Sequence, residues 1–247
     1  MCYSIGLMKK PPIEKPAFPM RINKYLALKK HSTRRGADEL VAKGQVFING
    51  RLAVLGDKVN EKDNVEVKFR GKVKPYIYIA YNKPEGVLTH SAAEGEKEIK
   101  TEVAIKDVFP IGRLDKDSHG LIILTNDGRI TDRLLNPKHI HEKEYLVKTK
   151  NELRESFKDK MEAGVQIDKE RTGKCKVTIL DEKTFKVILT EGKKHQIRRM
   201  CDALFQEVGD LKRTRIMNIE LGKLSNGAHR EIVGDELQTF LHSLELA

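Results

Sequence analysis

The chain has 247 residues and a formal net charge of +11, with 47 Lys and Arg residues against 36 Asp and Glu residues. This size allows one large domain or two smaller ones, and the basic balance favours a polyanionic partner such as a nucleic acid. No apolar run approaches the ~20 residues of a membrane span, and no secretory signal is evident. The three cysteines lack C-x-x-C spacing, so neither a disulfide framework nor a zinc site is predicted. Their thiols are expected to be reduced, as in a cytoplasmic protein.

Residues 1–19 hold four of the eight prolines of the chain. This composition predicts a loosely ordered arm that helps to hold RNA. The positive charge is concentrated just after it, because the segment from Arg21 to Arg70 has 12 Lys and Arg residues against 6 Asp and Glu residues. We therefore expect the first quarter of the chain to carry much of the contact with a polyanion.

Residues 20–68 are predicted to form a small unit with two helices followed by strands. Apolar spacing indicates a first helix over Ile22–Leu28. Ser32 or Thr33 can cap a second helix, since their hydroxyl oxygens accept from the free N–H groups of a first turn. Gly44 is expected to end that helix.

A strand is predicted at Val46–Ile48, followed by Asn49-Gly50, a tight-hairpin signal, and a closing strand at Val65–Val67. With Arg21-Ile22-Asn23-Lys24-Tyr25-Leu26 at its start and Thr33-Arg34-Arg35 opening its second helix, the segment resembles an S4 RNA-binding domain. Two arginines at a helix start, where backbone N–H groups also face outward, suit a phosphate. The basic residues of this unit that we expect to contact RNA are Arg21, Lys24, Arg34, Arg35, Lys43 and Arg51.

A linker is predicted at residues 69–75, and a second domain at residues 76–247. Tyr76–Tyr81 has the period-2 character of a strand, and Asn82-Lys83-Pro84-Glu85-Gly86 is expected to form a turn. The strand therefore opens the second domain.

The most informative stretch is Ile111–Gly120, which places five charged or ionisable side chains between two glycines. The apolar run Leu121–Leu124 behind it is predicted to be a buried strand. A polar loop fixed to a rigid strand suits a catalytic group, although a solvated charged turn has a similar composition. Residues two apart share a face of an extended loop, so spacing alone does not choose between Asp115 and Asp117.

Three motifs in this region are Gly112-Arg113-Leu114-Asp115, Ser118-x-Gly120-Leu121 and Leu124-Thr125-Asn126-Asp127-Gly128. Together they resemble the RsuA/RluB/RluE/RluF group of pseudouridine synthases, in which an Asn-Lys-Pro-x-Gly turn also occurs, matching the turn at Asn82. The resemblance implies that Asp115 is the catalytic residue and that Arg113 occupies the space left by the extruded nucleotide.

After a short helix predicted at Ile130–Leu135, His139 and His141 form an H-x-H pair that we do not interpret as a metal site, because no Cys or carboxylate cluster completes a ligand set. Lys143-Glu144-Tyr145 resembles the family's Lys-x-Tyr element. This implies that Tyr145 packs against the target base, while an ordinary strand aromatic is the alternative.

Asn151 is expected to cap a helix that carries Leu153, Phe157 and Met161 on its core face and ends at Gly164. Two alternating strands are predicted within residues 175–189. Further on, an amphipathic helix over residues 235–246 is expected to close the domain.

Gln196-Ile197-Arg198-Arg199-Met200 is the second strong motif, at the start of a helix with Ile197, Met200, Cys201, Leu204 and Phe205 on its predicted buried face. It resembles the family's Gln-Ile-Arg-Arg-Met element, which implies that Arg198 pairs with the catalytic Asp and that Ile197 lines the uracil pocket. The basic residues expected to contact RNA here are Lys193, Lys194 and Arg199. His195 departs from the Arg that is common before Gln in the family, which puts a phosphate contact in doubt.

The resemblance implies an α+β protein, with a small αα-β S4 domain followed by a catalytic domain built on a mixed, mostly antiparallel sheet flanked by helices. It implies an enzyme that isomerises uridine in RNA without a cofactor. Arg215-Ile216-Met217-Asn218, with Met where most members have Gly, points to the RluF branch and to 23S ribosomal RNA, with tRNA as a second target. We expect a monomer that does not bind membranes.

Three alternatives remain open at this point. The first is a small-subunit ribosomal RNA or tRNA substrate. The second is an RNA-binding assembly factor built on the S4 unit, which the basicity alone would suit. The third is a hydrolytic nucleosidase or glycosidase, for which Asp117 would supply the second carboxylate that such enzymes usually need.

Overall fold

The chain divides into two compact units, with the division between Val73 and Lys74. The residues that the computed structural model describes are 17–29, 31–68, 75–136 and 139–246. Most of the expected arm (residues 1–19) and of the expected linker (residues 69–75) lies outside the described residues, so the predicted domain boundaries stay predictions. None of the described helices has the length and apolar character needed to cross a membrane.

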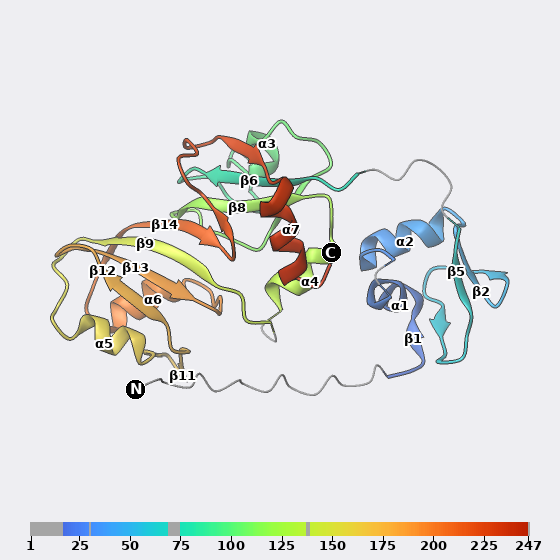
Figure 1. Ribbon diagram of the computed structural model, residues 1–247, viewed down its shortest axis with the longest axis horizontal. Helices are drawn as coiled ribbons and strands as arrows, with labels where there is room; N and C mark the ends of the chain where they lie inside the picture. The colour runs from blue at the N-terminus through green and yellow to red at the C-terminus, as the bar shows by residue number, and fades with distance from the viewer. Residues whose placement is uncertain (1–16, 30, 69–74, 137–138, 247) are drawn as a thin grey trace. The chain divides into compact units, whose positions relative to one another are not determined.

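The first unit packs two helices against short strands (Figure 1). Its described elements are β1 (Met20–Arg21), α1 (Ile22–Leu28), α2 (Arg34–Ala42), β2 (Val46–Ile48), β3 (Arg51–Leu52), β4 (Lys58–Val59) and β5 (Val65–Val67). Strand β2 lies in the centre of an antiparallel sheet with the order β3-β2-β5, and β1 pairs with β4. Leu26 of α1 and Val41 of α2 are buried against Val46. The expected αα-β arrangement is confirmed.

Two local signals of this unit act as the sequence predicts. The Thr33 hydroxyl oxygen caps α2 by accepting a hydrogen bond from the Gly36 N–H at 2.9 Å. Asn49 and Gly50 have φ angles of 51° and 81° and form a two-residue hairpin loop, because Ile48 pairs directly with Arg51.

The second unit is built on a mixed sheet with the strand order β12-β13-β9-β14-β8-β6-β16, to which β15 adds beside β14 and β7 beside β8. Its described strands are β6 (Tyr78–Lys83), β7 (Phe109–Ile111), β8 (His119–Thr125), β9 (Lys143–Thr149), β10 (Gln166–Ile167), β11 (Glu170–Arg171), β12 (Lys176–Ile179), β13 (Thr184–Leu189), β14 (Val208–Ile216), β15 (Ile219–Glu220) and β16 (His229–Glu231). Its described helices are α3 (Ile99–Glu102), α4 (Arg129–Leu135), α5 (Phe157–Glu162), α6 (Gln196–Ala203) and α7 (Gly234–Ser243). Among the described strands, β8 and β14 are parallel and the other pairs are antiparallel, so the predicted mixed, mostly antiparallel sheet is confirmed.

Strand β8 is buried on both faces, which explains its continuous apolar run. Leu121 and Ile123 join the cluster that contains α4 and α7, whereas Ile122 and Leu124 join the cluster that contains α3. Figure 1 shows α5 and α6 together beside the β12–β13–β9 part of the sheet, where their side chains form a third cluster around Phe185. The helices therefore hold β8 and β14 in the middle of the domain.

Three local predictions are wrong. Helix α5 begins after Ser156 instead of Asn151, because the Asn151 side-chain amide is hydrogen-bonded to the backbone of Phe205 and Glu207. Strand β6 continues through Lys83, which pairs with Gly120. Phe205 is 72% exposed instead of buried, since it follows the end of α6 with a φ angle of 60° that turns the chain away.

Candidate active site

The Asp115 loop, residues 112–118, connects β7 to the start of the central strand β8. Leu114 anchors it in the core with 7% exposure, and Ser118 N–H donates to the Asp115 carbonyl at 3.1 Å to close a turn. The Asp115 side chain keeps 34% of its surface exposed. The loop therefore presents this carboxylate at the surface from a fixed backbone.

The segment after β6 fixes the other side of the loop. The Thr89 hydroxyl donates to the Leu114 carbonyl at 2.7 Å and accepts from the Leu114 N–H at 3.1 Å. The Gly86 N–H donates to the Lys116 carbonyl at 2.9 Å. The residues on both sides of Asp115 are thus tied to the Asn-Lys-Pro-x-Gly region, which gives that motif a structural role.

Helix α6 brings its first turn to the same loop. Arg198 donates from Nη2 to the Asp117 carbonyl at 2.7 Å and from Nη1 to the Val208 carbonyl at 3.3 Å. The ion pair expected between Arg198 and Asp115 is not among the contacts of the described residues. The partner of the Asp115 carboxylate is instead His195, with 3.2 Å between Nδ1 and Oδ2.

His195 lies at the start of α6. It is the N-cap of the helix and has the left-handed angles φ 49° and ψ 31°. Arg198 lies about one helical turn further along α6, so its guanidinium meets the loop at the Asp117 carbonyl. Sequence reasoning noticed His195 only as a departure from the family pattern, and did not identify this contact.

Tyr145 and Ile197 pack on the same hydrophobic cluster, between β9 and α6. Tyr145 is half-buried, whereas Ile197 is only 4% exposed and offers little more than an edge to a ligand. Arg113, near the start of the Asp115 loop, is exposed. The structure thus places Asp115, Arg113, Arg198 and Ile197 on the loop and the helix that meets it, with Tyr145 beside Ile197.

A row of paired residues across the sheet runs behind the loop. Tyr145 of β9 pairs with Arg213 of β14. Arg213 pairs with Gly120 of β8, and Gly120 pairs with Lys83 of β6. Sheet register therefore connects four residues that are up to 130 positions apart in the sequence.

Two of these residues are buried cations that sequence reasoning did not assign to the site. Lys83 is fully buried and donates from Nζ to the carbonyl oxygens of Pro84 and Val87 at 2.9 and 2.7 Å. Arg213 is 3% exposed and donates from Nε to the Leu121 carbonyl at 2.6 Å. Burial, then repulsion from Arg213, lowers the pKa of the Lys83 ammonium to about 8, against the attraction of Asp115.

This lowered pKa predicts how stability depends on pH. Below about pH 8 Lys83 is protonated in both the folded and unfolded chain, but between about 8 and 10.5 the unfolded chain binds more protons. We therefore expect the free energy of unfolding of the wild type, relative to a Lys83→Met variant, to increase across that interval in urea titrations followed by circular dichroism. If the difference in the free energy of unfolding between the two proteins did not change with pH, the lowered pKa of Lys83 in the folded chain would be contradicted.

The basic residues expected to contact RNA are mostly exposed, and several are engaged by acids. In the first unit Arg34 and Arg35 are exposed at the start of α2, while Arg51 pairs with Asp57 at 2.9 Å. The other candidates of that unit are exposed as well: Arg21, Lys24 and Lys43. In the second unit Lys193 pairs with Glu170 at 2.9 Å, Arg199 contacts Asp168, and Lys194 is exposed. These ion pairs would have to open or rearrange for phosphate binding.

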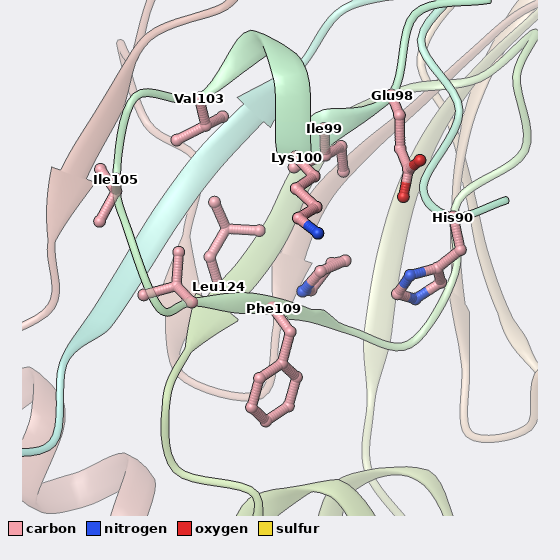
Figure 2. A pocket seen from close by; sticks show the side chains of 10 residues that line it. His90, Glu98, Ile99, Lys100, Val103, Ile105, Phe109 and Leu124 are labelled. Carbon is pink, nitrogen blue, oxygen red and sulfur yellow. The ribbon is translucent and has the colours of Figure 1, made fainter. Parts of the chain in front are cut away.

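Two further features, the H-x-H pair and a cavity, are formed by other residues. The rings of His139 and His141 stack with centroids 6.0 Å apart, and no group of three or more potential ligands gathers in the described parts of the chain. A cavity of about 230 Å³ lies between α3 and β7. Figure 2 shows Val103 and Ile105 on one side of it and Glu98 and His90 on the other. Leu124, at the far end of β8 from the Asp115 loop, also lines it.

Comparison with known proteins decides the family. Residues 77–203 match the family described as RNA pseudouridylate synthase, and residues 20–65 match the S4 domain. The chain belongs to the RNA pseudouridylate synthase family. It is 40% identical over 228 residues to the dual-specificity RNA pseudouridine synthase RluF of Escherichia coli (strain K12), covering 90% of this chain and 78% of that protein.

Two further relatives agree. The ribosomal large subunit pseudouridine synthase B of Bacillus subtilis (strain 168) is 33% identical, covering 88% of this chain and 94% of that protein. A crystal structure of a pseudouridylate synthase superposes with a TM-score of 0.67 at 28% identity, covering 91% of this chain and 99% of that chain. The resemblance to the RsuA/RluB/RluE/RluF group and the S4 domain are therefore confirmed, and the protein is an RNA pseudouridine synthase, an isomerase.

Proposed function

We propose that this RNA pseudouridine synthase acts on specific uridines of large-subunit (23S) ribosomal RNA in the cytoplasm, with Asp115 as its catalytic residue. The observation that carries the proposal is the placement of the Asp115 carboxylate: half-exposed, on a loop fixed by Thr89 and Gly86, and facing the first turn of α6. The relatives named for RluF and for the ribosomal large subunit support the substrate.

The reaction moves the sugar from N1 to C5 of the same uracil. The C1′–N1 bond breaks, the uracil turns while it is held, and a C1′–C5 bond forms as the C5 proton leaves and N1 gains one. A uridine must leave the base stack before a side chain can reach its sugar. Exposed Arg113, two residues from Asp115, would fill the vacated space by stacking and by binding phosphate.

Asp115 must be ionised, either as the nucleophile toward C1′ or as the base toward the sugar C2′ proton. A carboxylate covered by a bound base tends to protonate, and nearby cations oppose this. His195 contacts Asp115 directly, and the Lys83 ammonium lies close enough to be attracted by it. These two side chains would take the role that the family resemblance gives to Arg198.

Arg198 would then act on the loop through its backbone. Its guanidinium joins the Asp117 carbonyl to the Val208 carbonyl at the start of β14, so it holds the loop against α6 and β14. Tyr145 and Ile197, which share one cluster, would limit the movement of the uracil as it turns.

The S4 unit would hold the RNA through its exposed basic residues. Replacing Arg34 and Arg35 together by alanine is expected to weaken RNA binding and to reduce the slope of log affinity against log salt by about 1.4, since each phosphate contact on a single strand contributes about 0.7. Filter-binding titrations between about 50 and 200 mM salt measure this slope.

A double variant with the same charge change provides the control. Lys58 and Lys62 are exposed in the same unit, in β4 and in the turn that follows it. Their joint replacement by alanine is expected to leave the salt slope nearly unchanged. Equal effects of the two double variants would mean that α2 does not make a specific phosphate contact.

A transfer RNA is the second candidate substrate, because the RluF relatives are named dual-specificity enzymes. Pseudouridines can be mapped by carbodiimide-dependent reverse-transcription stops in the ribosomal RNA and the tRNA of a deletion strain. This mapping tests both candidate substrates. We expect a stop to disappear from large-subunit ribosomal RNA. Its loss only from small-subunit ribosomal RNA or tRNA would overturn the substrate assignment.

A further inference from the structure

His195 provides the catalytic carboxylate with a direct contact from the start of α6. Its Nδ1 lies 3.2 Å from Asp115 Oδ2, and both side chains are partly open to solvent, at 44% and 34% exposure. The backbone of Asp115 is already fixed through Leu114 and Ser118. Rotation of its carboxylate is the remaining freedom, and the His195 ring beside Oδ2 restrains that rotation while leaving Oδ1 for the sugar.

The other cations around His195 have different partners. On its own segment Lys193 pairs with Glu170, and on α6 Arg199 contacts Asp168. From the Asp115 loop, Lys116 pairs with Glu96 at 2.8 Å.

The remaining charged groups lie close by. Arg198 is hydrogen-bonded to backbone carbonyls, Lys194 is exposed, and Asp117 is exposed on the loop. Lys83 and Arg213 lie buried behind the loop. Among the described contacts of Asp115, the direct ion pair is the one with His195.

We propose that His195 is a positioning residue for Asp115: the imidazolium holds the carboxylate in its reactive orientation, and loss of the imidazolium proton slows the chemical step. The proposal rests on the catalytic role of Asp115 proposed above. Imidazole groups change charge near neutral pH, and only the protonated ring attracts a carboxylate through opposite charge. The enzyme would therefore be faster on the acidic side of neutrality.

Single-turnover rates on a ribosomal RNA fragment, from about pH 6 to about pH 8.5, across the titration range of imidazole, test this. We expect the wild-type rate to fall about fivefold over that range, the most that a partly exposed ion pair is expected to contribute. In His195→Asn a neutral amide replaces the imidazole, and Asn tolerates the left-handed backbone of this position. Its rate should match the slow wild-type limit and stay flat with pH, and His195→Arg, which stays charged, should also be flat.

The matched control is His242→Asn, which removes an exposed imidazole of the last turn of α7 in the same domain. It should retain the wild-type profile, and thermal unfolding should show all variants folded. A wild-type profile in His195→Asn would overturn the inference, and so would an effect on the RNA concentration dependence alone, which would make His195 an RNA contact.

A further variant separates this inference from the proposed function. If Asp115→Asn is inactive while His195→Asn keeps the wild-type profile, only the positioning role fails. If Asp115→Asn remains active, the catalytic role of Asp115 fails first.

Discussion

Replacing Asp115 with asparagine is expected to lower the rate of pseudouridine formation by a factor of about 10³ or more, which corresponds to about 4 kcal/mol of transition-state stabilisation. The amide has nearly the same shape as the carboxylate, and can still contact His195, but it can act neither as nucleophile nor as base. RNA affinity should remain close to that of the wild type, because the substitution removes a negative charge and no cation. Single-turnover rates and filter binding on the same RNA measure the two quantities.

Asp117→Asn is the matched control for this prediction. Asp117 is two residues away in the same loop, its side chain is exposed, and it contributes its backbone carbonyl to Arg198, which the substitution retains. We expect nearly full activity from it. Loss of activity in Asp117→Asn with survival of Asp115→Asn would exchange the roles of the two carboxylates.

Gly120→Ala is expected to reduce the free energy of unfolding by about 3 kcal/mol or more. Gly120 has a φ angle of +105°, and a Cβ there would lie 2.4 Å from the Arg213 carbonyl oxygen and 2.8 Å from its nitrogen. Backbone atoms in the middle of β14 cannot move away as a flexible side chain would, so the parallel pairing of β8 and β14 must shift. Urea unfolding followed by circular dichroism measures the loss.

Gly222→Ala separates backbone strain from this collision. Gly222 also has a positive φ angle, of +56°, but no heavy atom lies within 4 Å of an added Cβ. Its substitution should cost about 1 kcal/mol, the usual effect of an alanine in the left-handed region. Equal losses in the two variants would show that close strand packing at Gly120 is unimportant.

Elements set by neighbouring residues were predictable from the sequence. The Thr33 cap, the Asn49-Gly50 hairpin and the buried strand behind the Asp115 loop all follow from local hydrogen bonds or from side-chain period, and the structure has them in place. Motif resemblance added the family and brought Asp115 and the start of α6 into one site. The structure places both there, although the catalytic role of Asp115 stays a prediction.

Features set by contacts between distant segments were not predictable in this way. Asn151 fails as a helix cap because its amide binds the backbone near Phe205, 54 residues away. Lys83 and Arg213 appear as ordinary basic residues in the sequence, yet sheet register buries both behind the loop. The left-handed backbone of His195 and its contact with Asp115 have no signal in residue type alone.

The most direct test of the account is the fate of label in ribosomal RNA that contains uridine tritiated at C5. Isomerisation removes the C5 hydrogen while the uracil stays attached to the chain, so the wild type should release one tritium to water for each uridine modified, with no labelled free base and no change in RNA chain mass beyond the label. Asp115→Asn should release tritium slower than the wild type by a factor of about 10³ or more. Labelled uracil free in solution would reveal hydrolysis of the glycosidic bond instead, and release of tritium by Asp115→Asn at the wild-type rate would contradict the central role of this carboxylate.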